Sequence, residues 1–197
     1  KEIQGLQLQE GINTEYIAKL LRAAILTRNL EEPWQDIFGR FNTAINEAKK
    51  YGLSQQLFEI HYQLGWTEFY WHEQPKSMFE QYLIIKSLLK DEVNPSRIEK
   101  VMNLLNLVRT SSAIGTLTAE DVDIDKENQD WEELMQQIKN NPNLPASAVF
   151  VQLLQLEMEL AYAATSKKPV DEILNKLLHK VDEAQLYYDI SLESCSI

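Results

Sequence analysis

The sequence has little of what several other classes of protein need. Its 197 residues include one cysteine, Cys195, so no disulfide can form within the chain. Six glycines and six prolines are few for a chain rich in turns, which argues against an all-β fold. The longest apolar run, residues 160–164, is far shorter than the roughly 18 residues of a membrane-spanning helix. Signal peptide and initiator methionine are also missing, so we expect part of a longer chain, in a reducing, cytoplasmic compartment.

What the chain does have is a sufficient apolar content and a strong acidic charge. Hydrophobic residues make up 44% of it, which excludes wholesale disorder. The net charge is −11 and is uneven, with −1 in residues 1–116 and −10 in residues 117–197. Nucleic acids and anionic membranes attract basic proteins, so we expect neither as a partner. A basic protein partner fits this charge.

Apolar residues recur at helical spacing along nearly the whole chain and predict eight helices in four pairs. Asn13 and Ser54 are expected N-caps, Pro33, Pro75 and Pro145 open helices, and Asp130 with Glu133 has the spacing of a capping box. First helices begin near residues 12, 53, 95 and 145, and second helices near residues 33, 75, 118 to 130, and 169.

The spacing of these starts, near 40 residues, is typical of an α-solenoid built of helical hairpins. We therefore predict an all-α fold over residues 1–197, an α-α superhelix of about four hairpins forming one domain. Residues 117–129 read as an acidic insertion within the third pair. An irregular helical bundle is the alternative.

Residues 41–90 resemble a tetratricopeptide repeat. Phe41, Ala44, Ala48 and Tyr51-Gly52 match its second helix and turn, and Leu64-Gly65-Trp66 is similar to its Leu-Gly element. In that family the glycine lets the paired helix approach closely. The resemblance implies a superhelical scaffold that binds a peptide or protein segment in a concave groove, often as a sensor or adaptor in a larger regulatory protein. Glu68 departs from the pattern, since the family places an aromatic residue there.

The third predicted helix carries the candidate partner-binding residues. A stripe of aromatic residues, Phe58, Tyr62, Trp66 and Tyr70, runs along it at steps of four. His61, Glu68 and His72 share another face, which we expect to be partly exposed. If that face lines a groove, His61, Glu68, His72 and Trp66 contact the ligand, which is expected to be basic or aromatic. For the aromatic stripe, core packing is the favoured interpretation, and a ligand-stacking surface is the alternative. His61 and His72 are about 16 Å apart along a helix, too far to share one metal ion.

The acidic segment contains a calcium-loop spacing. Five carboxylates stand at positions 1, 3, 5, 7 and 12 of a twelve-residue loop: Asp121, Asp123, Asp125, Glu127 and Glu132. Lys126 occupies the position that normally holds glycine, so a solvated acidic insertion is favoured over a metal site.

No phosphate-binding glycine loop, zinc pair or nucleophile elbow occurs in the sequence. We therefore predict a non-catalytic domain without cofactor or metal that binds a peptide or protein. Two alternatives remain: a self-association or spacer module, and a calcium-responsive domain.

Overall fold

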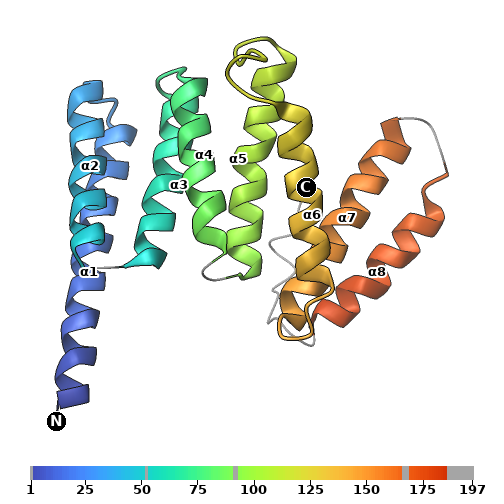
Figure 1. Cartoon of the computed structure of the whole chain (residues 1–197), viewed down its shortest axis with the longest axis horizontal. Helices are drawn as coiled ribbons and strands as arrows, with labels where there is room; N and C mark the ends of the chain where they lie inside the picture. Colours follow the sequence, from blue (N-terminus) through green and yellow to red (C-terminus); the bar gives the residue numbers. More distant parts are fainter. Residues whose placement is uncertain (1, 52, 91–92, 166–168, 186–197) are drawn as a thin grey trace. The chain divides into compact units, whose positions relative to one another are not determined.

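The computed structural model describes residues 2–51, 53–90, 93–165 and 169–185. Within these ranges the chain forms eight α-helices and no strand, which confirms the predicted all-α class (Figure 1). Cys195 lies outside the described residues. In chain order the helices are α1 Glu2–Asn29, α2 Trp34–Lys50, α3 Ser54–Tyr70, α4 Pro75–Leu89, α5 Pro95–Ala113, α6 Ile124–Lys139, α7 Pro145–Thr165 and α8 Asp171–Gln185.

Prolines mark the helix starts well, whereas the predicted polar caps Asn13 and Ser54 do not. Helices α4, α5 and α7 begin at a proline, and α2 begins directly after Pro33. The predicted cap Asn13 lies inside α1, and α3 has Leu53, not Ser54, at its N-cap, without a side-chain hydrogen bond. A proline fixes φ and cannot donate to the preceding turn, so its signal is stronger than that of a residue which also occurs inside helices.

Helix α6 begins at Ile124, inside the range of residues 118 to 130 predicted for its start, so the proposed capping box at Asp130 lies within the helix. Asp125 and Glu127 stand in its first turn, where carboxylates interact favourably with the helix dipole. Trp131, Met135 and Ile138 form its buried stripe. Half of the expected acidic insertion is therefore the first turn of a helix.

The chain packs as two compact units. Unit 1 comprises residues 1–92 and 98–124, and unit 2 comprises residues 93–97 and 125–197. No helix in the described part of either unit has the length and apolar character needed to cross a bilayer.

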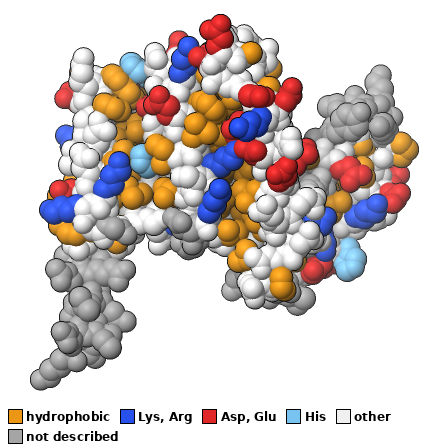
Figure 2. All heavy atoms as spheres, in the orientation of Figure 1, with side chains coloured by type: hydrophobic (Ala, Val, Ile, Leu, Met, Phe, Trp, Pro, Cys, Tyr) orange, Lys and Arg blue, Asp and Glu red, His pale blue; other side chains and the backbone are white. Residues whose placement is uncertain are grey.

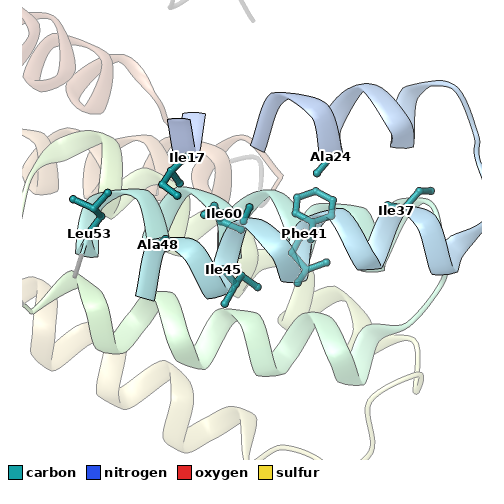
Figure 3. Close-up of a cluster of buried hydrophobic side chains, with 10 residues drawn as sticks. Ile17, Ala24, Ile37, Phe41, Ile45, Ala48, Leu53 and Ile60 are labelled. Atoms are coloured by element: carbon teal, nitrogen blue, oxygen red, sulfur yellow. The ribbon is translucent and has the colours of Figure 1, made fainter. Parts of the chain in front are cut away.

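In unit 1, α1 packs against α2, α2 against α3 and α3 against α4, and α1 also packs against α3. A buried cluster lies where α1, α2 and α3 meet, with Ile17 and Ala24 from α1 and Ile60 from α3 around Phe41 of α2 (Figure 3). The same arrangement continues to α5, whose Lys100 pairs with Glu59 of α3. This consecutive packing is consistent with a superhelix of helical hairpins.

The turns of unit 1 repeat every 42 residues. Positive backbone φ angles occur at Glu31 (55°), Glu73 (51°) and Gly115 (78°), each after the first helix of a pair. In the first and third turns this residue donates its N–H to the carbonyl three residues earlier, and the next residue donates to the carbonyl five residues earlier. The period predicted from apolar spacing is thus matched by a repeated turn geometry.

In unit 2, α7 packs against α8. The Lys139 ammonium at the end of α6 donates to the Gln155 side chain of α7 at 3.3 Å. Helix α8 buries Ile173 and Ala184, whereas Leu174 and Leu178 are exposed on its other side.

Candidate functional site

Helix α3 separates two surfaces of different character. One surface faces α4 and is closed, and the other carries aromatic side chains that reach solvent. Both belong to unit 1, so their geometry can be compared directly.

The closed face is a stripe of three residues, His61, Gly65 and Glu68, at helical steps of four and three. A Cβ atom at Gly65 would lie 2.9 Å from Cδ1 of Leu104 in α5 and 3.2 Å from Cβ of Gln81 in α4. At these distances, a side chain at position 65 would force Leu104 and Gln81 to shift. Gly65 therefore permits the close helix approach that was expected of it.

Gln81 of α4 crosses over Gly65 and joins the two polar residues on either side of it. Its Oε1 atom lies 2.7 Å from Nδ1 of His61, and because an amide oxygen only accepts, His61 donates. A second side-chain hydrogen bond links Gln81 to Glu68. All three residues are buried, with 3% of Glu68 and 6% of His61 exposed. The Oε2 atom of Glu68 is buried and has no hydrogen-bond partner among the described residues.

Burial sets the charge state of this network. It raises the pKa of Glu68 to about 8, and the nearby Glu80 adds to the rise, while the hydrogen bond from Gln81 opposes it. Burial also lowers the pKa of His61. Near neutral pH the carboxyl group of Glu68 therefore holds its proton and His61 is uncharged, so the interface between α3 and α4 contains polar groups but no buried charge.

The predicted polar face is consequently not an exposed one. His61 and Glu68 lie inside the α3–α4 hairpin, so the expectation that they line an open groove is wrong, because Gly65 draws α4 onto the same stripe. His72 lies beyond the end of α3, where its ring stacks on Trp34 with 4.0 Å between centroids. Trp66 is partly exposed and belongs to the other face of α3.

The open face of α3 carries a row of aromatic rings that we call the ladder: Tyr62, Trp66 and Tyr70. Trp66 meets Tyr62 edge-on at 6.2 Å and stacks on Tyr70 at 4.7 Å between ring centroids. Tyr62 and Trp66 are half-buried, and Tyr70 is 52% exposed. The indole N–H of Trp66 is buried and has no hydrogen-bond partner in the described part of the chain.

Cations from neighbouring helices stand at both ends of this aromatic row. The Lys100 ammonium of α5 lies 5.5 Å from the ring of Tyr62. The Arg28 guanidinium of α1 lies 4.5 Å from the ring of Trp71, directly after Tyr70, and its Nη1 donates to Thr67 Oγ1 at 3.3 Å. The ring of Tyr62 in the ladder and the ring of the adjoining Trp71 therefore each have a cation over one face.

Sequence reasoning missed Arg28, Gln81 and Lys100 as members of these surfaces. Each one comes from a different helix, and periodicity within α3 carries no information about them. Gly65 was the available signal for Gln81, since a glycine in a helical stripe marks the place where another helix comes near.

The calcium-loop spacing is not realised as a loop. Asp125, Glu127 and Glu132 lie on helix α6, which begins at Ile124. Asp121 instead accepts the N–H and hydroxyl of Thr118, each at 2.9 Å, and pairs with Lys76 at 2.6 Å. These contacts lower the pKa of Asp121 to about 2. Among the described residues, no three His, Cys, Asp or Glu side chains gather in a way that could hold a metal ion.

A scan against protein-family models and searches of curated proteins and of solved structures found no match to this chain. The resemblance to tetratricopeptide repeats therefore stays a prediction, and the interpretation of function depends on the geometry of the two faces of α3.

Proposed function

We propose that this chain is a non-catalytic helical-repeat domain that binds a peptide or protein segment. The observation that carries the proposal is the ladder on α3, whose rings stack on one another and end in the half-exposed Tyr70. Rigid aromatic side chains offer a large contact area at a small cost in conformational entropy, which is why they dominate protein interfaces. The contact surface is thus Tyr62, Trp66 and Tyr70, in place of His61 and Glu68.

The same part of the structure supports a proposal about the kind of protein to which the domain belongs. A polar network that is closed and uncharged, as between α3 and α4, serves rigidity and offers no group for acid–base chemistry at the surface. A rigid scaffold with an aromatic face suits an adaptor or sensor part of a larger regulatory protein, and the single cysteine suits a cytoplasmic one.

The proposal is tested by panning a peptide-display library on the purified chain and measuring the enriched peptides by fluorescence anisotropy. Tyr70→Ser is expected to weaken binding about tenfold or more, as for an aromatic residue central to an interface. Tyr16→Ser is the matched control, because Tyr16 is an exposed tyrosine on α1. Failure to enrich any peptide, or equal affinities for the two variants, would contradict the proposal.

Self-association is a second candidate function, and a specific observation favours it. Leu174 and Leu178 stand one turn apart on α8, and Leu178 is 63% exposed. Apolar residues in this arrangement are typical of a helix that packs against another one. Sedimentation velocity of the chain and of Leu178→Lys tests this candidate, and a wild-type chain that stays monomeric at every concentration removes it.

A further inference from the structure

The ends of the first two hairpins of unit 1 form a second aromatic surface, which we call the turn surface. It consists of Trp34 and Phe38 at the start of α2 and Trp71 and His72 after α3. Trp34 stacks on His72 at 4.0 Å and on Phe38 at 5.5 Å between ring centroids. Trp71 is 45% exposed and Phe38 37% exposed. Figure 1 shows that the α1–α2 and α3–α4 turns lie at the same edge of unit 1.

The exposed charges of these turns have one sign. Four carboxylates, those of Glu31, Glu32, Asp36 and Glu73, are exposed in the segments that carry the aromatic residues. The one Lys or Arg of segments 26–38 and 70–74 is Arg28, which is buried against Trp71. Lys76, just beyond, is paired with Asp121. Figure 2 shows acidic and basic side chains among exposed hydrophobic ones over the part of the surface formed by α1–α5.

An aromatic surface with an acidic border matches one kind of partner. The faces of tryptophan and phenylalanine rings attract guanidinium and ammonium groups, and the surrounding carboxylates attract the same groups over a longer distance. The chain itself provides an example on this surface, since the guanidinium of Arg28 lies on the ring of Trp71. An acidic or a nucleic-acid partner would be repelled.

We propose that the turn surface binds an arginine- or lysine-rich segment of another protein. This inference rests on the proposed function, because it names the class of partner that the peptide-binding domain takes. The turn surface adjoins the ladder, since Tyr70 contacts Trp71 edge-on at 6.5 Å between centroids. A segment that covers both surfaces would place its cations at the turns and its apolar residues along α3.

The test measures fluorescence anisotropy of labelled synthetic peptides that differ only in having arginine, glutamine or glutamate at alternate positions. We expect the arginine peptide to bind most tightly and to lose affinity as salt is added. Trp71→Ser should weaken its binding about two- to fivefold, the size of an exposed cation–π contact. The Glu31→Gln/Glu73→Gln variant should weaken it by a similar factor and keeps the fold, because both side chains are exposed.

The control Glu132→Gln/Glu133→Gln removes the same charge from exposed positions on α6. An equal loss in this control would overturn the inference, because binding would then follow net charge alone. It would also be overturned if the glutamine peptide bound as well as the arginine peptide, or if no arginine peptide bound at low salt. The proposed function fails separately, when library panning yields no peptide that depends on Tyr70.

Discussion

The two faces of α3 differ in composition, and their exposure is the reverse of what that composition suggests. The closed face holds His61 and Glu68 and the open face holds Tyr62, Trp66 and Tyr70, yet the polar residues are buried and the aromatic Tyr70 is exposed. The neighbouring helix causes this inversion: Gly65 lets α4 pack onto the polar stripe, and Gln81 forms hydrogen bonds to both polar residues. The polarity of a helix face therefore does not indicate whether that face is exposed to solvent. A small residue within the face is the better indicator, because it marks the place where another helix packs.

The largest loss of stability is expected from a substitution at Gly65, where the closed face has the least space for a side chain. Gly65→Val should lower the free energy of unfolding by about 3 kcal/mol, because the added carbons overlap Leu104 and Gln81. Urea unfolding followed by circular dichroism measures the change. Gly39→Ala in α2 is the control, since nothing lies within 4 Å of a Cβ there and alanine should stabilise that helix by about 0.5–1 kcal/mol. A tolerated valine at position 65 would show that the helices are not held at this distance.

The second-largest loss of stability is expected when the hydrogen bonds that link Gln81 to His61 and Glu68 are removed. Gln81→Leu keeps the size of the side chain but removes both hydrogen bonds, which leaves His61 and Glu68 buried without their partner. The expected loss is about 2 kcal/mol. Gln35→Leu, at an exposed position of α2, controls for the change of residue type. If both variants unfolded at the same urea concentration, the bridge would have no part in stability.

A smaller effect on stability is expected from the ionisation of Glu68, which can be measured separately from the packing of the closed face. The pKa of Glu68 is about 8 in the folded chain and about 4.3 when unfolded, so the folded state binds the extra proton between these values. The contribution of Glu68 to the free energy of unfolding is fully present below about pH 4, and it is lost as the pH rises through 8. Between pH 7 and pH 9 the loss should be about 1 kcal/mol.

Over this range His61, whose pKa is lowered, is neutral in both states and adds nothing. Unfolding of the wild type and of Glu68→Gln at the two pH values isolates the effect. Equal slopes for the two proteins would mean that the carboxyl group of Glu68 is already ionised near neutral pH.

The smallest effect on stability is expected on the open face. Lys100→Met removes the ion pair between Lys100 and Glu59. Both side chains are about one-third exposed, and ion pairs of this kind contribute less than about 1 kcal/mol to the free energy of unfolding. Tyr70→Ser should also change stability little, because half of that side chain is already in solvent. A large loss from either variant, measured by the same urea titration, would indicate that the open face supports the fold and is not free for a partner.

The sequence predicts the architecture of this chain well because the evidence for it is local. Apolar spacing and prolines lie within single helices, so Pro145 and the stripe after it predict α7 correctly from end to end. The start of α6 was predicted only as a range of residues, 118 to 130, because its first turn is mostly charged and offers little apolar periodicity, although carboxylates are favourable at that position.

The candidate site could be predicted only in part. The aromatic row on α3 was visible in the sequence, but the division of α3 into a closed and an open face depends on how α4 and α5 pack against it, which periodicity within α3 does not report. His61 and Glu68 were assigned to a ligand-binding surface because their stripe was polar. The same stripe contains Gly65, and the close helix approach expected there should have placed these residues inside the hairpin.

The left-handed residues at 31, 73 and 115 have a consequence for how this chain can change in length. These residues occupy equivalent positions in three turns and are 42 residues apart. Deleting the residues between two of these turns would therefore join one turn to the next, and the following helix would start in the same direction. A single added residue inside α3 would instead rotate everything after it by about 100° and exchange its two faces. Unit 1 can therefore gain or lose length by whole hairpins far more readily than by single codons.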